Sequence, residues 1–270
     1  MTTDTIPTWD RYTGPPAAIY EQHFVPAIGR PFAERVVEAA APRAGERVLD
    51  VACGTGIVAR IAAEHLGGHG LVVGVDGHPG MLATARATYP AGDWRQASAE
   101  GLPFDDERFD AVLCSLGLQF FADKNRALDE MRRVLRPGGR TVIATAGPTP
   151  AALRALHDVL ADHLGDHVAA FVDAVFTLDD TERLGEMMTA GGLANVETSR
   201  ETIQLRLDPP ADFFWQYVLG TPLAEHVADV GADRRAALEQ DIVERWQPFT
   251  DDDGLRIEVD MVLGTAWRSA

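Results

Sequence analysis

The chain has 270 residues, 46% of them hydrophobic, which is enough for one large α/β domain with an insertion. Its formal net charge of −17 at pH 7 would repel phosphate backbones and anionic lipids, which argues against nucleic-acid substrates and membrane docking. The sequence has two cysteines, Cys53 and Cys114, and lacks both an apolar signal core and an apolar stretch of bilayer length. We therefore expect a cytoplasmic protein without disulfides or membrane insertion.

The N-terminal residues are predicted to form an arm followed by a cap helix. Residues 1–19 show no sustained hydrophobic period, and the helical pattern that follows them is interrupted near Pro26 and Pro31. We therefore treat residues 1–41 as a unit that precedes the main fold.

Strands and helices are predicted to alternate along residues 42–147. The expected strands are Arg47–Val51, Leu71–Asp76, Trp94–Ala97, Phe109–Ser115 and Thr141–Ala146. The expected helices are Ile57–Leu66, Pro79–Thr88 and Asn125–Leu135. Such alternation predicts a parallel sheet with helices on both faces, whose ligands bind beyond the carboxyl ends of the strands.

After Gly147 the pattern changes, and residues 148–270 are predicted to complete the sheet with helical insertions. The expected helices are Ala151–Leu164 and Thr181–Ala190, followed by a mainly helical stretch over Asp208–Pro248. The expected strands are Asn195–Leu207 and Leu255–Trp267. We interpret residues 148–175 and 208–250 as lid elements over a substrate pocket.

A glycine-containing turn follows the first predicted strand. The strand ends in the acidic residue Asp50, and Gly54 and Gly56 lead into a helix N-terminus. Glycine permits tight backbone angles and close approach of a ligand, and the helix presents free N–H groups. Asp76 ends the second strand, where its carboxylate can accept hydrogen bonds from both hydroxyls of a ribose. Together these elements predict a site for a nucleoside cofactor.

The charge at the turn favours one kind of cofactor over another. The residues from Gly54 to Ala59 fit the dinucleotide fingerprint, which on its own is a weak signal. Asp50, however, lies at the mouth of the turn, where it would repel a pyrophosphate. A cationic ligand with an amino group and a ribose, such as S-adenosylmethionine (SAM), is favoured there.

Five segments in order along the chain resemble the motifs of class I SAM-dependent methyltransferases, most closely the ubiquinone/menaquinone-biosynthesis type. They are Asp50–Gly56, Gly74–Asp76, Pro79–Leu82, Ala99–Phe104 with Phe109 and Asp110 following, and Glu130–Arg140. The resemblance covers roughly residues 45 to 146. It implies a Rossmann-like, doubly wound, mostly parallel seven-stranded sheet with an antiparallel edge strand. It also implies SAM as cofactor and S-adenosylhomocysteine (SAH) as its product.

The resemblance also implies roles for particular residues. Asp50 should face the methionine end of the cofactor, Asp76 should hold the ribose, and Met81 should pack on the adenine. Two positions depart from the family pattern: Ala52 replaces a glycine, and Ser98 replaces an aspartate at the adenine amino group. The expected cofactor-binding residues are Tyr20, Asp50, Ala52, Gly54, Gly56, Asp76, Gly77, Met81, Ser98, Ala99, Ser115, Leu116 and Gln119.

The acceptor side of the site is expected in the less well matched segments. A base is needed if the acceptor is a phenol, an enol or an activated carbon, and His23 is the favoured candidate. The expected substrate-binding residues are Phe24, Phe213, Phe214, Trp215 and Tyr217. No cysteine and histidine spacing indicates a metal site, and the acidic run at Asp251 is interpreted as a solvated turn.

The sequence thus predicts a methyltransferase acting on carbon or oxygen of a small, largely apolar or aromatic metabolite, as in secondary metabolism. One alternative is a SAM-binding protein that does not methylate, such as a cyclisation catalyst or a regulator. A second alternative is an NAD(P)-dependent oxidoreductase, against which Asp50 and the later motifs argue. A small-molecule substrate is the expected partner, and a homodimer is left open.

Overall fold

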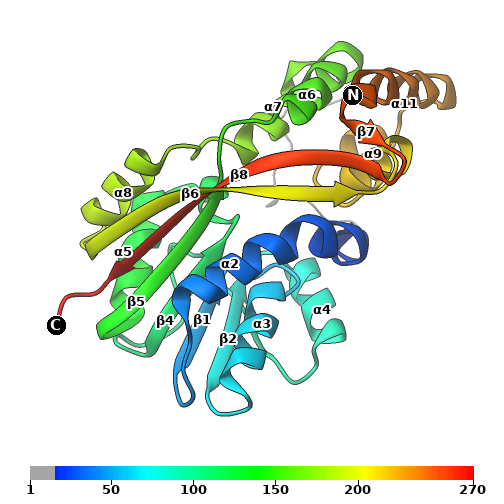
Figure 1. The fold of residues 1–270 in the computed structure, drawn as a ribbon. Coiled ribbons are helices and arrows are strands. Elements are labelled where there is room, and N and C mark those ends of the chain that lie inside the picture. The colour runs from blue at the N-terminus through cyan, green and yellow to red at the C-terminus, as the bar shows by residue number, and fades with distance from the viewer. Residues whose placement is uncertain (1–15) are drawn as a thin grey trace.

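The computed structural model describes residues 16–270, which form a mixed α/β fold around one twisted sheet (Figure 1). The expected arm with Trp9 and Tyr12 lies outside these described residues. Seven strands follow one another in the order β3-β2-β1-β4-β5-β8-β6, and a short eighth strand pairs with β8 alone. The strands are β1 Arg47–Val51, β2 Leu71–Asp76, β3 Asp93–Gln96, β4 Phe109–Ser115, β5 Leu135–Ala146, β6 Ala194–Leu207, β7 Thr250–Asp251 and β8 Gly254–Trp267.

The sheet confirms the predicted Rossmann-like class. The pairs formed among β1 to β5 are parallel, whereas β8 runs antiparallel to both β5 and β6. The antiparallel strand therefore lies one position in from the edge, and β6 forms the edge itself. The strand order reverses between β1 and β4, and the carboxyl ends at such a reversal are the usual ligand site of a doubly wound sheet.

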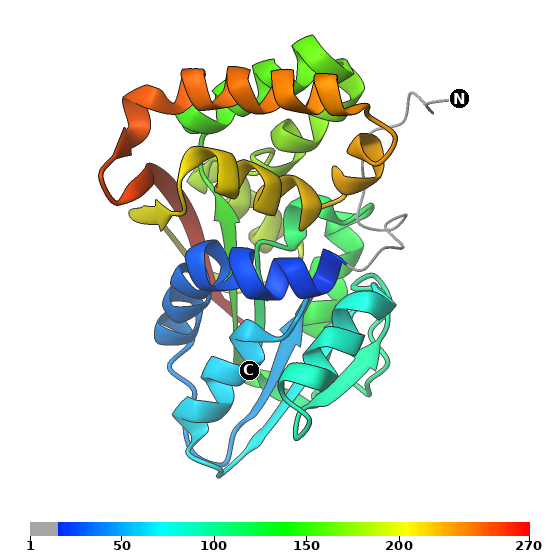
Figure 2. The same cartoon turned by 90° about the vertical axis from the view of Figure 1, so that its right-hand side faces the viewer.

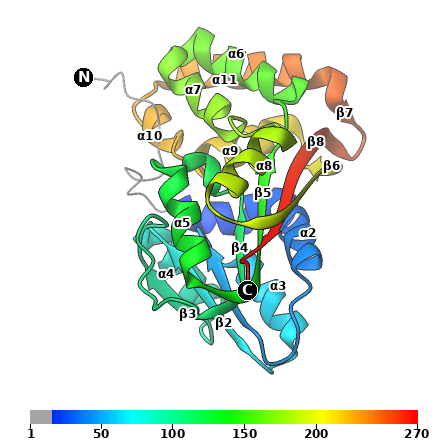
Figure 3. The same cartoon turned by 90° about the vertical axis from the view of Figure 1, so that its left-hand side faces the viewer.

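Helices cover both faces of the sheet, and an additional group of helices stands above it (Figure 3). One face is covered by α2 and α3, and the other by α5 and α8. The helices are α1 Pro16–Ile19, α2 Arg30–Ala40, α3 Ile57–Leu66, α4 Pro79–Thr88, α5 Lys124–Val134, α6 Ala151–Leu164, α7 Asp166–Val175, α8 Thr181–Ala190, α9 Pro210–Leu219, α10 Ala224–Val227 and α11 Ala232–Trp246. Residues 16–270 contain no helix with the length and apolarity needed to cross a membrane.

Local signals explain where several helices begin and end. The Asp123 carboxylate accepts from the N–H of Arg126 at 2.9 Å and caps α5, and Asp180 caps α8 in the same way. Gly67, with φ of 59°, ends α3 in the left-handed conformation that glycine adopts without strain. These caps account for the close agreement between the predicted and observed helices of the core.

The N-terminal helix differs from the prediction of an interrupted pattern. The segment Tyr20–Gly29 is a π-helix, η2, which contains Pro26 and joins α1 to α2 without a break. Its closing bond runs from the N–H of Arg30 to the carbonyl of Val25, five residues earlier. The wider turn tolerates a proline that would clash in an α-helix, and Pro31 lies in the first turn of α2.

The two predicted lid segments form one helical cap. Pairing of β5 with β8 ends at Ala146 and Met261, and beyond that point β6 and β8 continue as a two-stranded ribbon. Helices α6, α7, α9 and α11 lie together beside this ribbon (Figure 1), and α9 contacts β8. The buried Trp246 side chain of α11 donates from Nε1 to the carbonyl of Ala152 in α6 at 2.7 Å, which joins the two segments.

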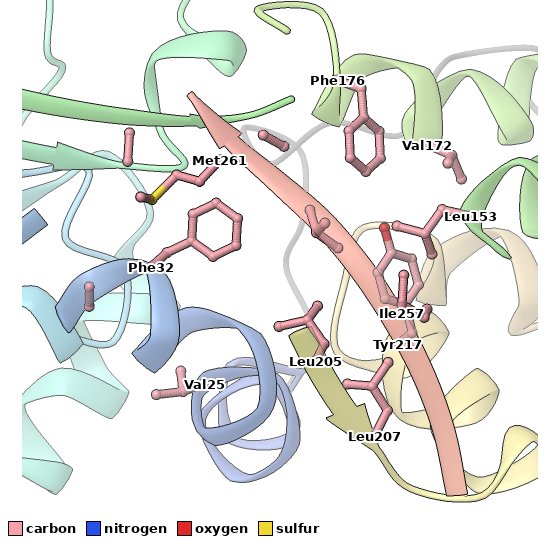
Figure 4. Packing of buried hydrophobic residues seen from close by; sticks show 14 of the residues in the cluster. Val25, Phe32, Leu153, Val172, Phe176, Leu205, Leu207, Tyr217, Ile257 and Met261 are labelled. Atoms are coloured by element: carbon pink, nitrogen blue, oxygen red, sulfur yellow. The ribbon is translucent and has the colours of Figure 1, made fainter. Parts of the chain in front are cut away.

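One apolar cluster runs without interruption from the sheet into the cap. Figure 4 shows Phe32 and Met261 on the sheet side of this cluster, with Leu205 and Ile257 on the ribbon and Tyr217 on the cap side. The N-terminal helices lie between the cap and the core, where η2 packs against α9 (Figure 2). The core, the N-terminal helices and the cap therefore meet near the switch point.

Candidate functional site

The loop after β1 is held in a conformation that depends on positive φ angles. The φ angles are 57° at Ala52, 54° at Gly54 and 90° at Gly56. The Gly56 N–H donates to the carbonyl of Cys53 at 2.8 Å, so this amide is used inside the turn. A Cβ placed on Gly54 would meet no atom of residues 16–270 within 4 Å, so this part of the chain leaves space beside the glycine.

Asp76 joins this loop to the next one. Its Oδ2 accepts from the N–H of Gly54 at 2.8 Å, and its Oδ1 accepts from the N–H of His78 at 2.7 Å. A carboxylate can accept several hydrogen bonds at once, and this is also the chemistry that a vicinal diol requires. The same side chain can therefore shape the loop and bind a ribose.

Asp50 is the most buried carboxylate of the loop region, with 1% of its surface exposed. Its Oδ2 accepts from the N–H of Ala59 at 3.0 Å, but its buried Oδ1 has no hydrogen-bond partner among the described residues. Burial raises the pKa of Asp50 well above its usual range, the Ala59 hydrogen bond opposes that rise, and Asp76 adds to it. An unpartnered, buried carboxylate oxygen fits a cationic ligand such as the sulfonium or ammonium of SAM.

Gly56 has a packing role that the sequence interpretation missed. A Cβ at Gly56 would lie 2.2 Å from the Trp94 ring, and a Cβ at Gly74 or Gly92 would lie 2.5 Å from it. The indole therefore occupies a slot lined by three glycines, and its Nε1 donates to the carbonyl of Tyr89 at 3.1 Å. The sequence predicted only a short third strand at Trp94. Its contacts with Gly56, Gly74 and Gly92 could not be predicted, because these glycines lie in three different segments of the chain.

The residues expected at the adenine lie around the ends of β2 and β3. Met81 is buried in the first turn of α4, where the His78 side chain caps its N–H at 3.1 Å. Ala99 is buried, and the carbonyl of Gly77 accepts from the Gln96 side chain at 3.2 Å. This places Gly77, Met81 and Ala99 on the side of the loop that carries Asp76.

Ser98 is exposed, and its hydroxyl is hydrogen-bonded to the carboxylate of Glu100. Burial raises the pKa of Glu100, but the bonds from Ser98 and nearby N–H groups outweigh it, so the net pKa is lowered. A negative charge is thus held next to Ser98, where the family usually has an aspartate. Glu100 appeared in the sequence only as part of a motif and was not predicted as a site residue.

Beyond β4 the chain brings three further predicted residues to the switch point. Ser115 Oγ and both amide atoms of Gln119 are buried without hydrogen-bond partners among residues 16–270. Leu116 has φ of 54°, and its N–H donates to the carbonyl of Ala144 at 2.8 Å. Asp50 aligns with Leu113 across β1 and β4, so these polar groups follow neighbouring strand ends.

The N-terminal helices bring Tyr20 close to Asp76. Burial raises the pKa of Tyr20, and the nearby negative charge of Asp76 raises it further by a smaller amount. The Tyr20 ring stacks on Phe24 with centroids 4.5 Å apart, and Phe24 lies 6.4 Å from Tyr217 of the cap. His23 is half-buried on the same helix. Tyr20, Phe24 and Tyr217 thus form an aromatic connection between the cofactor loops and the cap.

The other aromatic residues predicted to bind substrate lie in different surroundings. Phe213 packs on Trp246 with ring centroids 5.7 Å apart, and Phe214 is fully buried. Trp215 donates from Nε1 to Glu239 at 2.6 Å on the side of α11. These contacts place the three residues in the packing of the cap, and only Tyr217 contacts the N-terminal helix through a described ring pair.

Two open hollows on the protein surface lie elsewhere. One is lined by residues around Asn195 and Trp267, and the other by residues around Arg95 and Pro103. Neither hollow includes a residue of the loop after β1. The buried polar atoms without described hydrogen-bond partners, at the strand ends, therefore indicate the candidate site. In the described part of the chain, no three His, Cys, Asp or Glu side chains gather in a way that could hold a metal.

Comparison with known proteins identifies the family. A family model described as a methyltransferase domain matches residues 49–143. A demethylmenaquinone methyltransferase from Clavibacter sepedonicus is 38% identical over an alignment of 175 residues that covers 59% of this chain and 70% of the relative. The chain belongs to the class I SAM-dependent methyltransferases of the ubiquinone/menaquinone biosynthesis type. The corresponding C-methyltransferase UbiE from Idiomarina loihiensis is 32% identical, over 65% of this chain and 77% of the relative.

Solved structures show the same fold at lower identity. Phosphoethanolamine N-methyltransferase 2 from Haemonchus contortus has a TM-score of 0.60 and 20% identity, over 95% of this chain and 56% of that one. The 4+2 cyclase SpnF has a TM-score of 0.57 and 19% identity, over 98% of both chains. The protein is therefore a methyltransferase enzyme that uses SAM as its cofactor, built on a fold that also supports other chemistry.

Proposed function

We propose that this methyltransferase transfers a methyl group from SAM to a ring carbon of a small, apolar, quinol-type acceptor. The relatives that carry this proposal are named for demethylmenaquinone and for ubiquinone/menaquinone C-methylation, and each is matched over 70% or more of its length. A further relative, from Arabidopsis thaliana, is named a 2-phytyl-1,4-beta-naphthoquinone methyltransferase. The apolar cluster that runs into the cap supports an acceptor with substantial apolar surface.

The cofactor is proposed to lie across the strand ends of β1, β2 and β4. The unpartnered Oδ1 of Asp50 would meet the cationic methionine end, and Asp76 would accept from the ribose hydroxyls. Met81 and Ala99 would contact the adenine, and the Ser98 hydroxyl, bonded to Glu100, retains an acceptor lone pair for the adenine amino group. When bound, SAM supplies an electrophilic methyl carbon.

The acceptor is proposed to enter between the N-terminal helix and the cap, beside Phe24 and Tyr217. Methyl transfer is an in-line displacement, in which a π pair of the ring forms the new C–C bond and the S–C pair remains on sulfur as SAH leaves. The ring then loses the proton of the methylated carbon, and His23 is proposed to accept it. Positioning and exclusion of water would supply most of the rate acceleration.

One other activity is worth separating experimentally. The 4+2 cyclase SpnF shares the fold, so the fold itself does not distinguish a methyl donor from a bound but unconsumed cofactor. The protein should be incubated anaerobically with methyl-deuterated SAM and a short-chain 2-prenyl-1,4-naphthoquinol. A deuterated methyl group on a ring carbon in the product, located by NMR, would support the proposal. An O-methyl product, or SAM recovered unchanged, would contradict it.

A further inference from the structure

Gln119 is a buried side chain whose two polar atoms both lack hydrogen-bond partners among the described residues. It lies in the 3-10 helix η3 (Leu118–Phe120) after β4 and has 5% of its surface exposed. Both Oε1 and Nε2 are buried, and neither has a hydrogen-bond partner among the described residues. Burying an amide without partners costs free energy, so a fold that retains one indicates a ligand that completes it.

The position of Gln119 places this amide at the junction between core and cap. The next residue, Phe120, lies parallel to Phe171 of the cap helix α7, with ring centroids 6.4 Å apart and planes 14° apart. The previous residue, Leu118, is fully buried in the core. Gln119 is thus anchored on both sides, so its amide is held beside the end of β4.

Gln119 was predicted among the cofactor-binding residues, but the chemistry of its amide differs from that of Asp50 and Asp76. The cationic end of SAM calls for a negative charge, which Asp50 supplies, and the ribose calls for the carboxylate of Asp76. Gln119 is neutral and offers an acceptor oxygen beside two N–H donors. That combination matches a hydroxyl or carbonyl oxygen on an otherwise apolar ring.

We propose that Gln119 recognises the oxygen of the methyl acceptor and orients the neighbouring ring carbon toward the sulfonium methyl. This inference rests on the proposed function and identifies the acceptor oxygen as the feature that the site recognises. As the ring carbon takes the methyl group, positive charge spreads to the adjacent hydroxyl, which becomes a stronger donor. The hydrogen bond from that hydroxyl to Oε1 of Gln119 therefore strengthens toward the transition state.

The first test separates acceptor recognition from cofactor binding. Gln119→Met keeps the length of the side chain and removes its polar atoms, so the variant should fold at least as stably as the wild type. We expect its SAM affinity, measured by calorimetry, to stay within about twofold, and kcat/KM for 2-prenyl-1,4-naphthoquinol to fall on the order of 10–100-fold. Gln247→Met, on an exposed 3-10 helix, is the matched control and should change neither quantity.

The second test does not depend on turnover. Binding of 1-naphthol and of 1-methylnaphthalene, which carries a methyl in place of the hydroxyl, is compared on the SAH complex. Wild type should prefer 1-naphthol, and Gln119→Met should lose that preference. Gln119→Glu retains the acceptor oxygen and should keep the preference for 1-naphthol.

The outcomes of the two tests are distinct. If wild type methylates no quinol but prefers 1-naphthol, and Gln119→Met loses that preference, the proposed function fails and the role of Gln119 in recognising the oxygen stands. If Gln119→Met keeps the preference, the inference is overturned. A tenfold loss of SAM affinity in folded Gln119→Met would assign the side chain to the cofactor and overturn the inference. Equal binding of the two naphthalenes by wild type would also overturn it.

Discussion

The main-chain N–H of Gly54 donates a 2.8 Å hydrogen bond to Oδ2 of Asp76, which joins the loop after β1 to the end of β2. The other oxygen of Asp76 accepts from the N–H of His78 at 2.7 Å. The carboxylate proposed to bind the ribose therefore also holds two loops in place. This double role changes what a substitution at Asp76 should do.

Asp76→Ala is expected to weaken SAM binding and to lower stability as well. Each charge-assisted bond lost to the ribose should cost roughly 1.5–3 kcal/mol of binding free energy. The N–H groups of Gly54 and His78 also lose their acceptor, which should lower the free energy of unfolding by about 1–3 kcal/mol. Calorimetry with SAM and urea unfolding measure the two effects. Unchanged SAM affinity in a folded variant would remove Asp76 from the site.

Asp50→Asn should stabilise the ligand-free protein near neutral pH while weakening its affinity for SAM. Burial raises the pKa of Asp50 in the folded state, so its contribution to stability is present below the unfolded pKa and is lost as pH rises through the folded value. Asparagine does not ionise, so the variant should not lose stability in this way as pH rises. Thermal unfolding from pH 4 to 8 should show a smaller decline for the variant, and equal pH profiles would contradict the assignment.

Substitutions at Gly54 and Gly56 should separate binding from folding. A Cβ at Gly54 would meet no atom of residues 16–270 within 4 Å, so Gly54→Ala should cost only about 1–2 kcal/mol of backbone strain. The added methyl group would occupy space beside the loop and should reduce SAM affinity strongly. A Cβ at Gly56 would collide with Trp94, so Gly56→Ala should chiefly lower the unfolding free energy. Unfolding and SAM titration of both variants provide the comparison, and identical behaviour would refute it.

Ala52 and Gly117 should behave as a coupled pair. A Cβ on Gly117 would lie 2.7 Å from the Cβ of Ala52, which itself has φ of 57°. Ala52→Gly should be stabilising or neutral, because glycine adopts this conformation without strain. Gly117→Ala should be destabilising in the wild type and less so in the Ala52→Gly background. A double-mutant cycle of unfolding free energies measures the coupling, and additive effects would show that the contact is unimportant.

The sequence by itself determined the features that local chemistry controls. The alternation of apolar strands and helices predicted the sheet, and the glycines after Asp50 predicted the loop, because φ angles and hydrophobic period depend on neighbouring residues. Asp76 was predicted as a ribose-binding residue from its place at a strand end. The family motifs supplied the cofactor, which the comparisons confirmed.

Other features were decided only by the tertiary structure, because they depend on residues that are far apart along the chain. The Trp94 slot needs Gly56 and Gly74, which lie far from Trp94 in the sequence, and the single cap depends on contacts between α6 and α11 such as the bond from Trp246 to Ala152. The π-helix accommodates Pro26 in a way that a search for helix breaks does not anticipate. The Gln119 amide has no hydrogen-bond partner among residues 16–270, and only the structure reveals this, since burial and hydrogen bonding are properties of the folded chain.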